Sequence, residues 1–222
     1  MITTFDQIEK LFVDLDKLLT RKVNIYVIGG AVMLHANLKP VTKDVDIIVD
    51  TNDEFKALNK ALKDSGFEGK IPTLDYTNMD LNQILIKDDF RIDLFQRNVC
   101  RGFSLSAGMI KRATNILNTQ NISLNLCSHE DILLFKCMTE REGDIQDSFA
   151  LGRRNLNWTV ILEELQLQIE KSKQKVWITW VAERLEILEE RGLNIPIMKT
   201  VSKLRAKYFN ELDKSIKSKK IQ

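Results

Sequence analysis

The sequence predicts an α+β fold in which a small mixed sheet is flanked by helices and followed by an all-helical C-terminal extension. Short runs rich in β-branched residues alternate with helical patterns in the first half of the chain. Two of these runs flank Asp88-Asp89 and predict a hairpin. After Gly143, apolar residues recur at helical spacing as far as the C-terminus. Together these observations separate a sheet-containing part from a helical part.

The sheet-containing part begins with a helix that opens at Thr4, where Gln7 has the spacing of a capping box. Lys39-Pro40 breaks the chain before an acidic β run that ends at Asp50. Residues 68 to 80 have no clear period and are expected to form a loop or a weak strand. The other expected elements are a strand over Asn24–Ile28, helices over Ala31–Asn37 and Asp53–Asp64, and the hairpin strands Asn82–Lys87 and Phe90–Phe95.

Further along, Ser104 is expected to cap a short helix that ends near Arg112. Two β runs follow, over Ala113–Leu117 and Asn121–Leu126, and then a helix from Ser128. Three helical stripes come last and are interpreted as core packing: Trp158, Ile161, Leu162 and Leu165; Trp177, Trp180, Val181 and Leu188; Ile197, Val201, Leu204, Tyr208, Leu212 and Ile216. These patterns suggest one domain over residues 1–155 and a helical extension over 156–222.

The composition favours a cytoplasmic protein without membrane contact. A hydrophobic content of 44% is enough for an ordinary core. Cys100, Cys127 and Cys137 form no Cys-x-x-Cys pair and are odd in number, so buried or unreactive thiols in a reducing compartment are expected. Acidic residues near the N-terminus argue against a signal peptide, and no apolar run approaches the length needed to span a membrane.

The charge of the chain is unevenly distributed. The net charge is only +2, but residues 199–222 contain eight Lys or Arg and two acidic residues, which gives +6 there and −4 elsewhere. A basic tail on an acidic body fits contact with nucleic acid or with nucleotide polyphosphate, and it also fits a solvated helical face. Both interpretations stay open at this point.

A glycine pair and an acidic pair form the most informative motif. Gly29-Gly30 ends the first β run, and the next β run carries Asp44 and Asp46, which share one face of a strand about 7 Å apart. Two carboxylates on one face favour a hard divalent cation, and glycines at a strand end can hold phosphate oxygens. Asp14-Leu-Asp16 has the same spacing but lies in a helical pattern, so we expect a solvated helix face there.

This motif resembles that of the DNA polymerase beta-like nucleotidyltransferase superfamily, in which Asp-x-Asp follows Gly-Gly or Gly-Ser. A third carboxylate lies on a later strand in that superfamily, and Phe90-Arg-Ile-Asp-Leu-Phe95 supplies Asp93. The segment from Ser128 to Asp147 resembles the helix of small AbiEii-type and uncharacterised prokaryotic nucleotidyltransferases. The resemblance covers about residues 20 to 155 and implies a sheet of the nucleotidyltransferase type in a catalytic domain over residues 1–155.

The resemblance also implies residue roles. Asp44, Asp46 and Asp93 would be the catalytic and metal-binding residues, holding two Mg²⁺ or Mn²⁺ ions around an NTP co-substrate. The implied nucleotide-binding residues are Gly29, Gly30, Thr42, Lys43 and Lys136.

Several residues have structural alternatives. Asp93 could instead form an ion pair with Arg91, which shares its strand face, and Lys136 could extend along an apolar helix turn. Asp144 and Asp147 are better explained as a brace with Arg141 or Lys136 than as ligands. The two histidines, His35 and His129, are too few and too separated for a zinc site, so both are expected to be structural.

The resemblance predicts nucleotidyl transfer to an acceptor hydroxyl or phosphate, with an RNA end such as that of tRNA favoured by the basic C-terminal helix. One alternative is an antibiotic-type adenylyltransferase that acts on a small molecule. Another is a toxin–antitoxin or regulatory binding subunit that retains the fold and docks a partner through Trp177 and Trp180. A protein partner or a homodimer stays open, as do the identities of the nucleotide and the acceptor.

Overall fold

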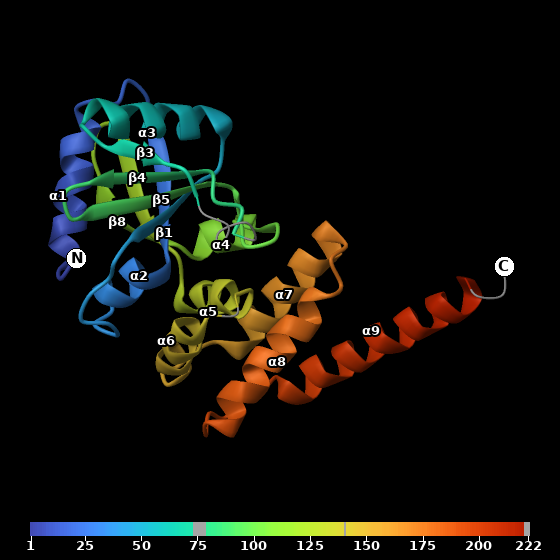
Figure 1. Cartoon of the computed structure of the whole chain (residues 1–222). Coiled ribbons are helices and arrows are strands. Elements are labelled where there is room, and N and C mark those ends of the chain that lie inside the picture. Colours follow the sequence, from blue (N-terminus) through green and yellow to red (C-terminus); the bar gives the residue numbers. More distant parts are fainter. Residues whose placement is uncertain (73–78, 140, 220–222) are drawn as a thin grey trace. The chain divides into compact units, whose positions relative to one another are not determined.

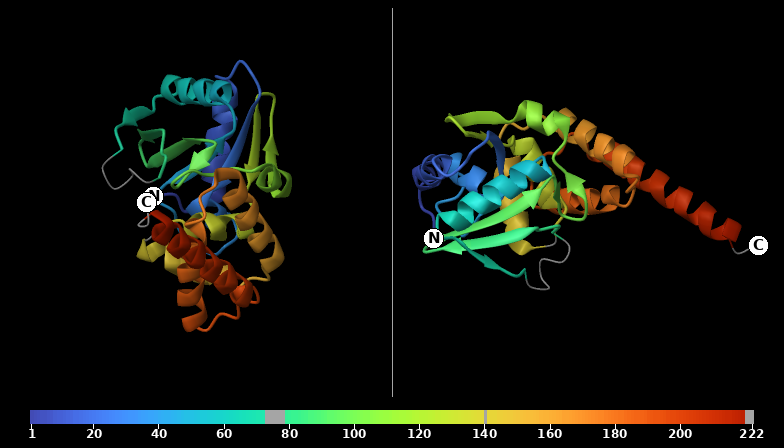
Figure 2. Two further views of the ribbon diagram at one scale, coloured as in Figure 1. Left: turned by 90° about the vertical axis from the view of Figure 1, so that its right-hand side faces the viewer. Right: turned by 90° about the horizontal axis from the view of Figure 1, so that it is seen from above.

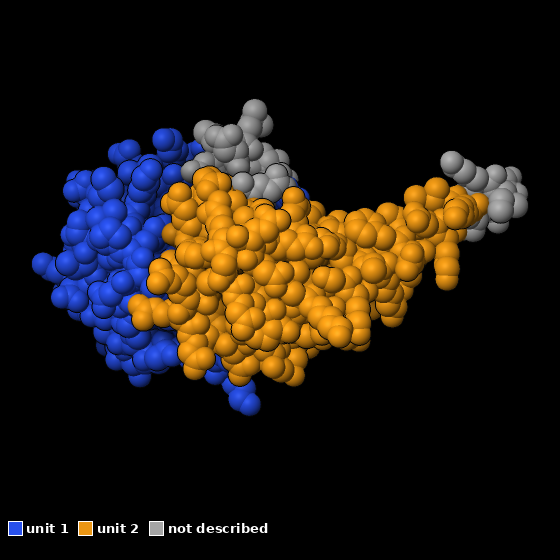
Figure 3. Space-filling model, turned by 90° about the horizontal axis from the view of Figure 1, so that it is seen from below, with its two compact units in different colours: residues 1–135 blue, residues 136–222 orange. Residues whose placement is uncertain are grey.

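The computed structural model describes residues 1–72, 79–139 and 141–219. Contacts between residues divide the chain into two compact units, Met1–Phe135 and Lys136–Gln222 (Figure 3). The boundary falls inside one helix, α5 (His129–Cys137). It comes earlier than residue 155, and the division into a catalytic domain and an extension at that residue stays a prediction.

Within the described ranges, the first unit contains a seven-stranded sheet in the order β3-β4-β5-β2-β1-β9-β8 (Figure 1). β1 pairs in parallel with β9 and β2 with β5, whereas the other neighbours are antiparallel. The strands of this sheet are β1 (Val23–Ile28), β2 (Val45–Val49), β3 (Glu68–Lys70), β4 (Gln83–Lys87), β5 (Phe90–Gln96), β8 (Thr114–Asn118) and β9 (Ile122–Leu126). This mixed sheet with its helices confirms the predicted α+β class.

The helices of the first unit cover the central strands. α3 (Asn52–Asp64) contacts β1, β2 and β5, and α1 (Phe5–Asp16) contacts β9. The middle strands are nearly continuous runs of buried apolar residues, as expected where both faces of a sheet are covered. α2 (Gly29–His35) begins at the glycine pair itself, two residues before the predicted start at Ala31.

Local signals explain the helix starts. Thr4 and Gln7 form the predicted capping box at α1. Thr51 caps α3 in the same way, because its side chain accepts the backbone N–H of Glu54 while the Glu54 carboxylate accepts that of Thr51. Each box satisfies backbone donors that the first helical turn leaves unpaired.

The hairpin of β4 and β5 is confirmed, with Lys87 paired to Phe90 across Asp88-Asp89. The predicted weak strand between residues 68 and 80 is β3 in part, whereas residues 73–78 of that prediction lie outside the described residues. The connection after β5 also forms a small two-stranded sheet of β6 (Asn98–Val99) and β7 (Phe103–Ser104), which the sequence did not predict.

Two predictions in the first unit are wrong in detail. Ser104 lies in β7, and Ser106 is the residue that caps α4 (Ala107–Arg112), because its hydroxyl accepts the Met109 N–H at 3.0 Å. Asp16 does not simply face solvent, since its carboxylate accepts the Thr119 hydroxyl at 2.6 Å and the Asn121 N–H at 2.7 Å. It therefore ties α1 to the turn between β8 and β9.

The second unit is helical over its described residues, as predicted: α6 (Glu142–Gly152), α7 (Trp158–Ser172), α8 (Trp177–Glu190) and α9 (Met198–Lys219). Ile161, Leu165, Trp177 and Val181 are buried, so core packing explains the first two apolar stripes. The last stripe differs from the prediction, because Leu212 is 40% and Ile216 46% exposed. Both residues belong to the C-terminal half of α9, and Figure 2 shows this red helix running on beyond the other helices of the second unit.

The cysteines and the helix hydropathy were both subjects of predictions from the composition. Cys100, Cys127 and Cys137 are all free and buried, as expected, and burial raises the pKa of the Cys137 thiol to about 12. Among the residues that the structure describes, no helix combines the length and the apolar character that a membrane span requires.

The cap of α4 can be tested by replacing Ser106 with Ala, which should lower the free energy of unfolding by about 1 kcal/mol because it removes the acceptor for the Met109 N–H. Urea denaturation followed by circular dichroism measures this difference. Ser104→Ala is the comparison and should cost less, because Ser104 does not cap α4. A larger cost for Ser104→Ala would contradict the assignment of the cap.

Candidate active site

The centre of the sheet places two acidic residues side by side. Asp46 in β2 is the register partner of Asp93 in β5. Register partners on neighbouring strands project from the same face, and such strands lie about 4.8 Å apart. The fold thus brings together two of the three predicted acidic ligands, although they are far apart in the sequence.

Gly29 makes room for the carboxylate of Asp46. Ile28, the last residue of β1, pairs with Asp46, so the chain enters α2 next to this side chain. A Cβ atom at Gly29 would lie 2.3 Å from the Asp46 Oδ2, and the φ angle of +66° at Gly29 also disfavours other residues. A side chain at position 29 would therefore displace the carboxylate.

Gly30 and Thr42 have a similar relationship. A Cβ atom at Gly30 would lie 2.5 Å from the Thr42 Oγ1. The Thr42 hydroxyl is buried and donates to the Asp44 carbonyl oxygen at 3.0 Å. Packing within the chain thus accounts for glycine at both positions, and Thr42 fixes the backbone of Asp44. The predicted contacts of Gly29, Gly30 and Thr42 with phosphate stay predictions.

Asp44 is placed differently from the expectation, because β2 begins at Val45 and Asp44 precedes it. Asp44 is half-buried, and Lys43 beside it is exposed. Asp44 therefore lies in the loop before β2, whereas Asp46 lies in the strand itself.

Arg91 holds Asp93 through two hydrogen bonds. The Arg91 Nε donates to one carboxylate oxygen and an Arg91 terminal nitrogen to the other, both at 2.7 Å. Asp93 is buried, with 1% of its surface exposed. The sequence offered this ion pair as the alternative to a catalytic role for Asp93. The pair and the role are compatible, because each carboxylate oxygen has a further lone pair.

The chemistry of the donor set suits a hard divalent cation. Three carboxylates, from Asp44, Asp46 and Asp93, meet the preference of Mg²⁺ and Mn²⁺ for oxygen ligands. Among the described residues, however, no group of three or more His, Cys, Asp or Glu side chains converges in the geometry of a metal site. Asp46 and Asp93 are neighbours by register, while Asp44 lies in the loop before β2, and the joint role of the three stays a prediction.

Lys136 lies in the second unit, where its ammonium group contacts two buried carboxylates. It donates to Asp144 at 2.8 Å and to Asp147 at 2.6 Å, and Arg141 donates to the other oxygen of Asp144 at 2.7 Å. The predicted brace of Asp144 and Asp147 is therefore confirmed. Binding of phosphate by Lys136 stays a prediction, and it requires the ammonium group to leave a buried cluster.

The charges of this cluster stabilise one another. Burial by itself raises the pKa of Asp144, but Lys136 and Arg141 outweigh burial and bring the pKa to about 2. An Asp in an unfolded chain has a pKa of about 3.9. The ionised Asp144 thus stabilises the fold above about pH 4, and this contribution disappears as the pH falls through about 2.

Arg184 is a member of the same neighbourhood that the sequence did not reveal. Its guanidinium group donates to the backbone carbonyl oxygen of Thr139, at the end of α5. Thr139 in turn donates its hydroxyl to the Lys136 carbonyl oxygen at 3.0 Å. No local pattern links α8 to this turn, because Arg184 occupies an ordinary polar position in a helical repeat.

Comparison with protein families gives one match that covers most of the chain. The model of the family described as "Nucleotidyltransferase of unknown function (DUF6036)" matches residues 3–180. The match includes the three acidic residues and Lys136, and it ends before α9. It supports the resemblance to nucleotidyltransferases, while a closer relation to AbiEii-type proteins stays a prediction. A search of curated proteins found no match.

Solved structures give weaker likenesses. The chain is similar to ANT(2'')-Ia in complex with adenylyl-2''-tobramycin, at 13% identity over 92% of this chain and 98% of that chain, with a TM-score of 0.43. A solution structure of the antibiotic-resistance factor ANT(2'')-Ia gives 14% identity, coverage of 84% and 95%, and a TM-score of 0.41. A chain from H. pylori, provisionally assigned as a nucleotidyltransferase, has 12% identity to this chain and a TM-score of 0.36. The similarity covers 88% of this chain and 89% of that chain.

The contact between Gly29 and Asp46 can be tested with Gly29→Ala, compared with Gly102→Ala. Both glycines have positive φ angles, but a Cβ atom at Gly102 would meet nothing within 4 Å. Gly102→Ala should cost about 1 kcal/mol of stability from backbone strain. Gly29→Ala should cost more, since its Cβ atom also displaces Asp46. Urea denaturation of both variants measures the difference, and equal costs would show that the contact is unimportant.

The brace can be tested with Lys136→Met, which leaves Asp144 and Asp147 buried without their shared counterion. We expect a loss of about 3 kcal/mol or more in the free energy of unfolding. Lys43→Met is the matched control at an exposed lysine and should change stability by less than about 0.5 kcal/mol. Adding Asp144→Asn and Asp147→Asn to Lys136→Met should restore part of the loss. A loss as small as that of Lys43→Met would argue against the brace.

Proposed function

The chain belongs to the family described as nucleotidyltransferases of unknown function, and on this basis we propose that it is a metal-dependent enzyme that uses an NTP. It moves a nucleoside monophosphate to an acceptor hydroxyl or phosphate. The proposal rests above all on the register of β2 and β5, which pairs Asp46 with Asp93. Neighbouring carboxylates in the middle of a sheet are costly unless cations balance them.

The residues that would hold two Mg²⁺ or Mn²⁺ ions are Asp44, Asp46 and Asp93. When bound, such ions stabilise the charge that develops on the phosphate and on the entering and leaving oxygens. Gly29 leaves room for the Asp46 carboxylate. Asp44 completes the set from its loop, where the Thr42 hydroxyl holds its backbone.

Asp93 and Arg91 have separate tasks in this proposal. An acceptor oxygen attacks the α-phosphorus of the NTP, the bond to pyrophosphate breaks, and the proton of the acceptor passes to the Asp93 carboxylate. Arg91 touches no reacting atom and acts as a positioning residue, because its two hydrogen bonds fix the plane of that carboxylate. An aligned base contributes more to the rate than a mobile one.

Contacts with the nucleotide complete the proposal. The backbone at Gly29 and Gly30, which begins α2, and the exposed Lys43 are the groups of the first unit that we assign to the phosphates. Thr42 acts indirectly, since its hydroxyl is buried against Asp44. The assignment of Lys136 to phosphate requires release from Asp144 and Asp147, so we rank it below the others.

We favour an RNA end, such as that of tRNA, as the acceptor. Residues 199–222 have a net charge of +6, and α9 displays most of these lysines on its exposed surface. Contacts between lysines and phosphates strengthen binding of any RNA and weaken it as salt rises. A salt-dependent acceptor step is therefore expected, whereas binding of the NTP depends on the first unit.

A labelling experiment tests the function directly. The purified chain is incubated with each α-labelled NTP, Mg²⁺ or Mn²⁺, and either total cellular RNA or an RNA-free lysate fraction. Label in RNA supports the proposal in full. Label in protein or in a small molecule supports nucleotidyl transfer but contradicts RNA as the acceptor. Absence of label with every nucleotide and fraction would contradict enzymatic activity.

The two paired carboxylates should be separable by mutation. Asp46→Asn should abolish transfer, and Asp93→Asn should lower the single-turnover rate at least about a hundredfold, which corresponds to about 2.7 kcal/mol. Asp93→Asn should still bind the NTP with Mg²⁺ in calorimetry, because Asp93 acts mainly in the transition state. Asp89→Asn, in the exposed hairpin turn, is the control and should retain full activity. If Asp93→Asn lost both nucleotide binding and the folded structure, the result would contradict a catalytic role. Asp93 would then serve to stabilise the fold through its ion pair with Arg91.

A further inference from the structure

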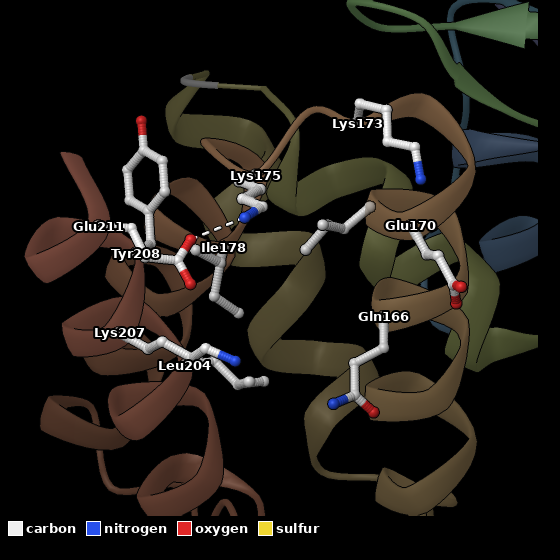
Figure 4. Close-up of a pocket in the computed structure, with 10 residues that line it drawn as sticks. Gln166, Glu170, Lys173, Lys175, Ile178, Leu204, Lys207, Tyr208 and Glu211 are labelled. Atoms are coloured by element: carbon white, nitrogen blue, oxygen red, sulfur yellow. Dashed lines mark hydrogen bonds and ion pairs between the residues drawn. The ribbon is translucent and has the colours of Figure 1, made fainter. Parts of the chain in front are cut away.

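The second unit contains an apolar groove between α7 and α9. Ile169 of α7, Ile178 of α8, and Leu204 and Tyr208 of α9 supply its apolar lining, and the cavity has a volume of about 310 Å³. Figure 4 shows Leu204 and Ile178 pointing into the groove from the α8 and α9 side, with Gln166 of α7 opposite them. A concave surface of this kind is suited to receive apolar side chains.

An exposed apolar ridge continues from this groove along α9. Leu204, Tyr208, Leu212 and Ile216 follow one another at intervals of four residues, which forms one of the ridges by which helices pack. Leu204 and Tyr208 are half-buried, whereas Leu212 is 40% and Ile216 46% exposed. The ridge therefore extends beyond the helices on which the first half of α9 packs (Figure 1).

The ridge ends up exposed because α9 is longer than its neighbour. Lys175, just before α8, pairs with Glu211 of α9 at 2.7 Å, so the start of α8 is level with Glu211. Eight further residues of α9, from Leu212 to Lys219, follow that point. At about 1.5 Å per residue they form roughly 12 Å of helix that carries apolar side chains.

Basic side chains border the groove and the ridge. Lys173, Lys175 and Lys207 line the groove together with Glu170 and Glu211, so lysines outnumber glutamates there, and Figure 4 shows the Lys207 ammonium directed toward the groove. On α9, Lys203 and Lys207 each precede a ridge residue, Leu204 and Tyr208, by one position, and both lysines are exposed. α9 as a whole has seven basic and two acidic residues, a net charge of +5. A partner with acidic flanks would complement this border.

We propose that the groove and the ridge dock an amphipathic helix with acidic flanks that belongs to a partner protein. Its apolar residues, spaced at i, i+3 or i+4, and i+7, enter the groove and pack along the ridge, and its acidic residues face Lys173 and Lys207. A second copy of α9 fits poorly, because it would bring two basic helices together. RNA requires the lysines but not Leu212 and Ile216.

This interaction surface differs from the one that the sequence suggested. Trp177 has only 1% of its surface exposed and is part of the core of the second unit, whereas Trp180 is half-buried, and docking through Trp180 stays a prediction. Leu212 and Ile216 are exposed at the far end of α9, where the periodicity of the sequence could not distinguish core residues from surface residues. The α9 part of this surface lies outside residues 3–180, which the family model covers, whereas the groove residues of α7 and α8, such as Ile169 and Ile178, lie inside that range.

The test uses the full chain and synthetic helical peptides as probes. The main probe is a fluorescent peptide of three heptads with Leu on one face and Glu on its flanks. A second peptide has the same composition with its Leu residues moved off the face, and a third has Lys in place of Glu. Anisotropy titrations should show binding of the first peptide at least about tenfold tighter than that of the others.

Matched variants locate the binding surface. Leu212→Gln with Ile216→Gln should weaken binding of the acidic peptide about tenfold or more, because both side chains lose apolar contact. Leu167→Gln is the control, since Leu167 is 49% exposed on α7 but does not line the groove. Lys207→Glu should also weaken this peptide and should improve binding of the lysine peptide. Circular dichroism checks that each variant keeps its helices.

Several results would overturn the proposal. Equal binding of the three peptides, or no effect of the Leu212 and Ile216 pair, would reject a helix-docking surface. A dimer in light scattering that the same pair dissociates would assign the ridge to a second copy of the chain. Binding of an RNA oligonucleotide that the pair weakens as much as it weakens the peptide would assign the ridge to RNA.

Discussion

The parallel pairing of β2 with β5 is the constraint on which the site depends. It sets Asp46 beside Asp93 in the middle of a sheet, where like charges repel and water is scarce. The surrounding residues make this arrangement possible. Gly29 leaves space for one carboxylate, and Arg91 neutralises the other through two hydrogen bonds. A shift of one position in the strand register would place the two acids on opposite faces and remove the site.

The sequence predicted much of this arrangement because its signals are local. The β runs, the capping box at Thr4 and the hairpin across Asp88-Asp89 each depend on a few adjacent residues, and all were found. The neighbourhood of Asp46 and Asp93 required knowledge of strand order, which the resemblance to a family supplied. Strand alternation alone would not have identified β2 as the neighbour of β5, because the hairpin partner of β5 is β4.

Other features depend on contacts between distant segments and could not be predicted in this way. The sequence predicted a solvent-exposed carboxylate at Asp16. In the structure, this carboxylate accepts hydrogen bonds from the turn between β8 and β9, which is 103 to 105 residues away in the sequence. Ser104 and Ser106 are both acceptable caps, and only the position of β7 decides between them. The apolar stripe of α9 is uniform in sequence, yet its burial ends where the neighbouring helices end.

The two charged clusters show different uses of burial. Lys136, Asp144 and Asp147 are all buried, and their charges compensate one another within the cluster. Such a cluster favours one arrangement of α5 and α6, since any other leaves an uncompensated charge. Asp93 is equally buried, but its counterion Arg91 is partly exposed, with 26% of its side chain accessible. The Lys136 cluster therefore has its central cation buried, whereas the cation of the Asp93 pair is partly exposed.

The burial of all three thiols has a practical consequence for studying this protein in solution. Cys100, Cys127 and Cys137 are shielded, and burial raises the pKa values of Cys127 and Cys137, so maleimide dyes should react with them slowly. A cysteine introduced at an exposed position such as Lys56 or Lys214 would then be labelled selectively without removal of the native ones. A donor and an acceptor dye at these two positions would report the distance between the units and how nucleotide changes it.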